Sequence, residues 1–154
     1  DAVSAMLYNE YHTLLSAGLN EEELSVFAMA DHGLNFPEDG IWCREELCAR
    51  TPEICRAFAA ATLEGWSYAF EHPEEALDIV MKYVDEAKIN ESRAHQRWML
   101  ARMKDLILPH GTSRSSGRLD RADYNRVARA LADAGIIQAI PDYGDVHVQD
   151  PGQE

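Results

Sequence analysis

The uneven distribution of predicted strands and helices constrains the fold of this chain more than any other feature. Three short segments with strand character all lie near the beginning of the chain, at residues 1–7, 24–30 and 40–43. They are apolar, partly alternating and too brief for helices. A sheet of two or three short strands is not stable alone, because it needs further strands or packed helices. The sequence therefore predicts part of a larger α/β protein whose other strands are missing.

From Arg44 onward the pattern predicts one helix after another. Thr51-Pro52-Glu53 is a start signal, with a hydroxyl N-cap, proline at the first helical position and an acid in the first turn. Its helix is expected to run to about Glu71. Similar start and stop residues predict further helices, at 8–17 before Gly18, from 73 onward, at 92–108 before Pro109, and at 120–135 with Asp120 as cap and Gly135 as end. Residues 110–117 are predicted to be a flexible loop.

The charge and hydropathy of the chain exclude several classes of function. The formal net charge is −13, which argues against binding nucleic acid or anionic lipid, since both need clustered Lys and Arg. No apolar run approaches the roughly 18 residues of a membrane-spanning helix. The acidic run at 21–23 is expected to be a solvated turn near Asn20. Because the chain opens on Asp1 rather than Met, we expect the natural gene to begin upstream, with any export signal there.

Three cysteines, Cys43, Cys48 and Cys55, lie within thirteen residues. An odd number cannot be fully paired, and the spacing matches no zinc or CxxC redox pattern. If Thr51-Pro52 interrupts the helix, Cys48 and Cys55 can approach each other in an oxidising compartment. The favoured interpretation is that all three are small buried or half-buried thiols.

No catalytic or metal-binding motif stands out in the sequence. GxSxG, HExxH, GxxxxGK and GxGxxG are absent, and the six histidines are scattered. Glu91 and His95 have helical i, i+4 spacing, but a weak surface pair explains them better than a metal site. Nothing in the spacing supports Cys43 and His32 as a nucleophile and its base. We therefore predict no catalytic residue, no metal ligand and no cofactor.

The candidate binding residues are Tyr8, Asn9 and Glu10, directly after a predicted strand and at the start of a helix. In α/β folds, ligands lie beyond the carboxyl ends of strands. A tyrosine offers a stacking face, an asparagine amide donates and accepts, and a glutamate can accept from a heterocyclic amine. A structural interpretation stays equally open: an acid in a first helical turn is favoured by the helix dipole, and the tyrosines can be core residues.

Several segments resemble the substrate-binding proteins of the thiamine-pyrimidine, sulfonate and nitrate import family. The resemblance is carried by the segments at 1–11 (DAVSAMLYNEY), 31–41 (DHGLNFPEDGI), 51–83, which includes GWSYAFEHPEEA at 65–76, 117–124 (GRLDRADY) and 134–137 (AGII). It extends over nearly the whole chain. It is specific for the family and uninformative about the identity of the ligand.

The resemblance implies a two-lobed, doubly wound α/β fold of the periplasmic-binding-protein type II class, roughly twice this length. This chain resembles its helix-rich C-terminal half, with two or three short strands near the N-terminus. Residues 1–40 would be the end of lobe two and the return crossing, and 41–141 the C-terminal helical part of lobe one. Residues 142–154 would be a loose tail.

The same resemblance implies a binding function without catalysis. Tyr8, Asn9 and Glu10 fall where pyrimidine-binding members contact the ligand, with Glu10 as the polar anchor, and Asp31 and His32 fall near the crossing strand, in the cleft wall or hinge. The implied partners are a small-molecule ligand, such as a thiamine-related pyrimidine, and the membrane subunits of an ABC importer. The implied location is periplasmic or otherwise extracytoplasmic, with a membrane anchor.

Two alternatives belong to other classes of protein. Some eukaryotic relatives are enzymes that make the thiamine pyrimidine with a histidine and a compact cysteine-rich motif, which Cys43, Cys48 and Cys55 do not form. A stand-alone helical domain is the other alternative. Its early strands would be unpaired edges that favour a homodimer.

Overall fold

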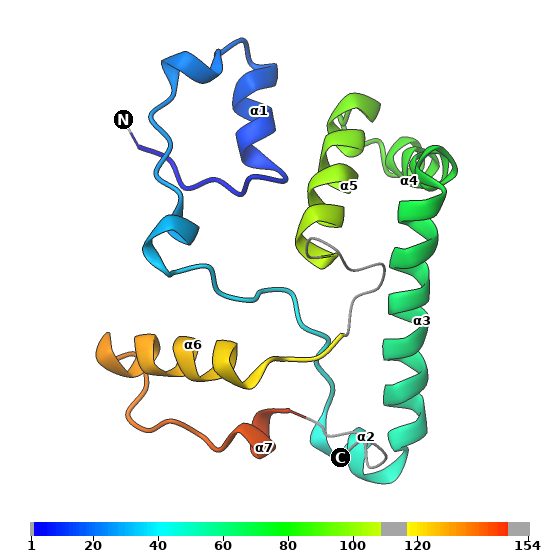
Figure 1. Ribbon diagram of the computed structural model, residues 1–154. Helices are drawn as coiled ribbons and strands as arrows, with labels where there is room; N and C mark the ends of the chain where they lie inside the picture. Colours follow the sequence, from blue (N-terminus) through cyan, green and yellow to red (C-terminus); the bar gives the residue numbers. More distant parts are fainter. Residues whose placement is uncertain (1, 109–116, 148–154) are drawn as a thin grey trace. The chain divides into compact units, whose positions relative to one another are not determined.

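The computed structural model describes residues 2–108 and 117–147 (Figure 1). In the described ranges, two compact units form: unit 1 from residues 2–26 and 43–108, and unit 2 from residues 27–42 and 117–147. The elements in chain order are α1 (Glu10–Ser16), the short 3-10 helices η1 (Glu21–Glu23) and η2 (Met29–His32), α2 (Glu45–Arg50), α3 (Pro52–Glu71), α4 (Pro73–Ala87), α5 (Arg93–Ile107), α6 (Arg121–Asp133) and α7 (Tyr143–Val146). No helix among these residues is long and apolar enough to cross a membrane.

Three successive helices, α3, α4 and α5, form most of unit 1 and pack against one another. Proline stands at the first position of both α3 and α4, where its missing N–H costs no helical hydrogen bond. The Ser92 side chain caps α5 by accepting from the His95 backbone N–H at 3.1 Å. These start signals confirm the helices that the sequence predicts at 51–71, from 73 onward, and at 92–108.

Glu74 links α4 to α5 through two arginines. Its carboxylate accepts from Arg97 at 2.9–3.1 Å and from Arg93 at 2.9 Å, while Arg93 also pairs with Asp78 at 2.5 Å. Hydrogen bonds from Arg97 and then Arg93 lower the pKa of Glu74 from 4.5 to about 2. The Glu74 side chain is 63% exposed, so solvent weakens this network and it orients the helices more than it stabilises them.

The buried core of unit 1 is small. Phe70 at the end of α3, Leu77 in α4 and His95 in α5 are its fully buried residues in the described ranges. Besides α3 and α4, α5 also contacts α1. Gly18 follows the end of α1 with a φ of +101°, a left-handed conformation that glycine adopts freely. The predicted stop of this helix at Gly18 is therefore confirmed.

Unit 2 is built around α6, which carries its own cap. Asp120 Oδ1 accepts from the backbone N–H groups of Ala122 and Asp123 at 2.7 and 3.2 Å, and Gly135 follows the helix with a φ of +69°. Both predicted ends of this helix are confirmed. Tyr143 of the short α7 donates to the carbonyl of Leu119, which lies just before α6, at 2.5 Å.

Part of the predicted loose tail is thus ordered. Tyr143 also lies edge-on to Tyr124, whose hydroxyl donates to the Pro141 carbonyl at 2.6 Å. The two aromatic side chains hold residues 141–147 onto α6, which composition alone did not reveal. The remainder of the tail at 148–154, together with Pro109 and the loop residues 110–116, lies outside the described residues.

The predicted N-terminal strands are wrong for the described chain, since residues 2–108 and 117–147 contain no strand. The backbone of the second segment is extended, with φ −106° and ψ 125° at Leu24 and φ −78° and ψ 118° at Ala28. It then turns into η2, which ends at His32 and is followed by Gly33 as its C-cap. A strand exists only as one side of a hydrogen-bonded ladder, so extended backbone without a neighbour remains irregular. Their apolar side chains are correspondingly exposed: Val3 by 69%, Val26 by 63% and Trp42 by 80%.

The start of α3 differs in one detail from the prediction. Thr51 occupies the N-cap position, but its hydroxyl donates to the Leu47 carbonyl of α2 at 3.1 Å and makes no cap hydrogen bond. The expected break between α2 and α3 is nevertheless present. The acidic turn near Asn20 is also confirmed, because Glu23 Oε2 accepts from the Asn20 backbone and side-chain nitrogens at 2.8 and 2.9 Å.

Candidate functional site

The candidate site lies at the N-terminal end of α1 in unit 1, where the sequence predicts Tyr8, Asn9 and Glu10 to act together. Tyr8 and Asn9 are half-buried, whereas Glu10, the first residue of the helix, is exposed. Glu10 Oε2 accepts from the Met6 backbone N–H at 2.9 Å. This bond is the main reason that the pKa of Glu10 lies below its ordinary value. A fixed, ionised carboxylate therefore stands at the helix start.

A buried histidine from α5 reaches the same place. His95 is 5% exposed, and its Nε2 lies 2.9 Å from Asn9 Oδ1. Its other ring nitrogen, Nδ1, lies 2.8 Å from Nδ1 of His12 in α1. Both nitrogens of the buried ring are thereby hydrogen-bonded, as buried polar groups require. His95, which is 83 positions from His12 and 86 from Asn9, therefore joins them in one polar cluster.

These contacts restrict the protonation states of the two rings. Asn9 Oδ1 is an acceptor, so His95 Nε2–H donates to it. A neutral His95 then has an unprotonated Nδ1, which accepts from His12 Nδ1–H. The alternative of two facing N–H donors at 2.8 Å is repulsive. The cluster therefore requires an unprotonated Nδ1 on one of the two rings, and the Asn9 amide is left with its N–H₂ donors.

Trp98 completes the contact between α1 and α5. Its ring stacks on His12 with centroids 4.8 Å apart and an interplanar angle of 24°, and its Nε1–H donates to the Leu7 carbonyl at 3.0 Å. The Leu7 carbonyl immediately precedes Tyr8 in the chain. Trp98 therefore anchors the backbone that leads into the candidate site, and Arg102 covers Trp98 with its guanidinium 5.2 Å from the ring.

Asp31 and His32 are placed elsewhere. Both lie in η2, in unit 2, and both are exposed. The His32 ring stacks almost parallel on Phe27, with centroids 4.4 Å apart and planes 5° apart. The structure thus brings Tyr8, Asn9 and Glu10 together in one unit, and Asp31 and His32 together in the other.

Sequence reasoning missed His12, His95 and Trp98 as neighbours of the predicted trio. His95 was expected in a weak surface pair with Glu91, but it is buried against α1, and the Glu91 carboxylate accepts from the Ser92 N–H at 2.7 Å instead. Helical spacing predicts that His95 and Trp98 share a face of α5. No local signal identifies α1 as the element that this face contacts.

The cluster has the features of a recognition site. An exposed carboxylate, an amide with donors available and a half-buried tyrosine lie within three consecutive residues, on a backbone held by Trp98 and His95. A carboxylate accepts several hydrogen bonds, so Glu10 can accept from a ligand as well as from Met6. The arrangement thus places an aromatic residue, an amide and a carboxylate in three consecutive positions.

Comparisons with known proteins match part of this chain. A family described as NMT1/THI5 like matches residues 1–76, which include the whole cluster on α1 but not α5. The riboflavin-binding protein RibY of Chloroflexus aurantiacus is 26% identical over 124 residues, covering 78% of this chain and 34% of that protein. The chain thus spans about a third of that relative's length. No solved structure matches this chain.

Proposed function

We propose that the chain, whose residues 1–76 match the NMT1/THI5-like family, is one part of a solute-binding protein that serves an ABC importer. The observation that carries the proposal is the position of Tyr8, Asn9 and Glu10 inside this matched region, on a backbone anchored to α5. The family and the relative's name point to a binding protein rather than an enzyme. The protein would act by closing around its solute, without making or breaking a bond.

In the whole protein, two lobes would enclose the ligand. Residues 1–40 would contribute the end of lobe two and the return crossing, residues 41–141 the helical part of lobe one, and residues 142–154 a terminal segment. Tyr8, Asn9 and Glu10 would form part of one wall of the cleft. Asp31 and His32 would line the crossing or act at the hinge. The protein would work outside the cytoplasm and present the closed form to the membrane subunits.

The ligand class that suits this wall is a planar nitrogen heterocycle. The relative is named for riboflavin, and the sequence resemblance offers a thiamine-related pyrimidine as one example. Both molecules contain a pyrimidine-type ring with polar edges and a face that an aromatic side chain can stack on. Tyr8 would stack on the ring. Glu10 would accept from a ring or exocyclic N–H, and the Asn9 amide would donate to a ring nitrogen or carbonyl.

The test uses the full-length protein that contains this chain, purified without added ligand. Mass spectrometry of the native protein, followed by denaturation, identifies any small molecule that co-purifies. A thermal-shift panel then compares riboflavin, the thiamine pyrimidine, a sulfonate and nitrate. We expect one heterocycle to raise the melting temperature by several degrees, because a ligand that binds only the folded state stabilises it.

Two outcomes would contradict the proposal. One is the absence of any shift across the panel together with no co-purifying molecule. The other is chemical conversion of the pyrimidine during incubation, detected as a new mass, which would assign the protein to the enzymes. A shift with the sulfonate or nitrate alone would keep the solute-binding role and reject the heterocycle.

A further inference from the structure

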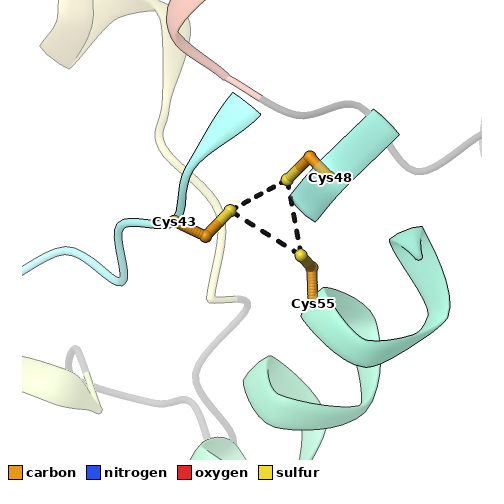
Figure 2. A group of neighbouring side chains, drawn as sticks. All are labelled: Cys43, Cys48 and Cys55. Carbon is orange, nitrogen blue, oxygen red and sulfur yellow. Dashed lines mark hydrogen bonds between the residues drawn. The ribbon is translucent and has the colours of Figure 1, made fainter. Parts of the chain in front are cut away.

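Three thiols gather at the beginning of α3, away from the elements that carry the candidate site. Cys43 Sγ lies 2.9 Å from Cys48 Sγ and 3.7 Å from Cys55 Sγ, and the Cys48 and Cys55 sulfurs are 3.4 Å apart. Figure 2 shows the three side chains converging from three different segments. All three lie in unit 1, and the group forms a closed triangle rather than a pair with a third thiol nearby.

The local fold explains why widely spaced cysteines meet. Cys43 precedes α2, Cys48 lies within α2, and Cys55 lies one turn into α3. Pro52 begins α3 directly after α2 ends at Arg50, so the chain changes direction between the two helices. That change of direction brings the Cys55 side chain next to Cys48. The sequence spacing resembled no zinc motif because the ligands come from two helices and an extended segment.

The triangle has the dimensions of a metal-binding face. Ligand sulfurs around a tetrahedral zinc are about 3.8 Å apart, given a Zn–S distance of about 2.3 Å. Two of the three separations are within about 0.4 Å of this value, and the third must open by about 0.9 Å. The closest pair is Cys43 and Cys48. Cys43 lies in an irregular segment and is exposed, so its side chain can move outward. A small outward shift of one side chain therefore completes the geometry.

A disulfide explains the meeting of three sulfurs less well than a metal ion does. Any disulfide involves two sulfurs and leaves the third thiol unpaired, although all three are in mutual contact. As neutral thiols they hydrogen-bond to one another. Thiolates so close together repel one another strongly unless a cation lies between them.

We propose that Cys43, Cys48 and Cys55 form a tri-thiolate site for a thiophilic metal ion, namely Zn²⁺ with a solvent molecule as fourth ligand. Thiolates are preferred ligands of zinc, which tolerates three protein ligands and one exchangeable position. In the described residues the group contains no fourth side chain, and Cys43 is open to solvent. The solvent-facing corner of the triangle is therefore the open position.

The ion would fasten a part of unit 1 that has little packing of its own. α2 has six residues, none of them buried, and the segment before it is irregular. A metal bound by one residue before α2, one within it and one in α3 would join all three. Binding to the folded arrangement alone then stabilises it, as in small metal-dependent domains. This role is independent of the proposed solute and of the site on α1.

The test titrates the reduced, chelator-treated chain with Zn²⁺ in competition with a chromophoric chelator, without oxygen. We expect one Zn²⁺ per chain and a rise of several degrees in melting temperature. Co²⁺ as a spectroscopic probe should give the near-ultraviolet charge-transfer absorption of thiolate ligands. Cys43→Ser, Cys48→Ser and Cys55→Ser should each weaken binding at least about a hundredfold, since each removes a direct ligand.

The matched control is His72→Gln, which removes a potential zinc ligand outside the triangle and should leave the affinity unchanged. Circular dichroism shows whether each serine variant keeps its helices. If a variant does not fold, the Co²⁺ spectrum of the unchanged chain still tests for thiolate ligands. Binding that survives Cys48→Ser, or a Co²⁺ spectrum without thiolate absorption, would overturn the proposal. So would a reduced chain that binds Cu⁺ but no Zn²⁺, or one that binds neither ion.

Discussion

The helices α3, α4 and α5 and the extended segments before residue 44 both contain many apolar residues, yet of these only the helices form regular structure. The helices hydrogen-bond within themselves and bury Phe70, Leu77 and His95 between them. The segments at 24–28 and 37–43 leave side chains such as Val26 and Trp42 63% and 80% exposed. A helix satisfies its backbone locally, whereas a strand depends on a partner elsewhere in the chain.

The difference indicates what the extended segments are suited to do. An exposed apolar segment with extended backbone favours pairing with another strand. In a two-lobed binding protein such strands would belong to the sheets of the lobes, and this chain spans 34% of its named relative. The same exposed edges are the basis of the dimer that the sequence suggests, which stays a prediction.

Hydrogen exchange should separate the two regions most strongly. Amides inside α3–α5 are expected to exchange at least about a thousandfold more slowly than those of residues 37–43, because the helical amides open only with the unit itself. Exchange followed by mass spectrometry on peptides from both regions measures this directly. Slow exchange at 37–43 in dilute solution would show that these residues already have a hydrogen-bonded partner.

A pair of aliphatic truncations should give the next largest effect. Leu77→Ala removes a side chain that is 2% exposed and should lower the free energy of unfolding of unit 1 by about 3 kcal/mol. Val26→Ala, at a side chain 63% exposed, should change it by less than about 0.5 kcal/mol. Urea unfolding followed by circular dichroism compares them. Equal losses would mean that the extended segment is packed in solution.

Acid should weaken the α4–α5 contact by a smaller amount. The pKa of Glu74 is about 2 in the folded chain, below its ordinary value of 4.5. Its ion pairs therefore stabilise the fold fully above about pH 4.5, and this contribution disappears as the pH falls towards 2.

Melting temperatures from pH 7 to pH 2 measure this effect. Glu74→Gln should melt below the unchanged chain at pH 7, and the difference should close at the acidic end. Glu86→Gln is the control, because the ion pair of Glu86 with Lys82 is exposed and has an N–O distance of 3.9 Å. A Glu74→Gln difference that does not vary with pH would contradict the assignment to the carboxylate.

The extent to which sequence predicted this structure follows from the same contrast between local and non-local interactions. Caps and breakers such as Pro52, Asp120 and Gly135 predicted helix ends correctly, because these signals act within a few residues. The contact of His95 with Asn9 and His12, and the convergence of the three cysteines, depend on where helices pack. The strands were predicted from propensity alone, and propensity cannot supply the pairing that a strand requires.

The central claim is that the start of α1 recognises a solute, and paired carboxylate variants test it most directly. Glu10 and Glu23 each accept from a backbone N–H, so Glu10→Gln and Glu23→Gln make matched local changes. Affinities of the full-length protein for riboflavin and for the thiamine pyrimidine are measured by titration calorimetry. We expect Glu10→Gln to weaken binding of the preferred solute at least about tenfold, and Glu23→Gln to leave it unchanged. Equal affinities in both variants would contradict the claim.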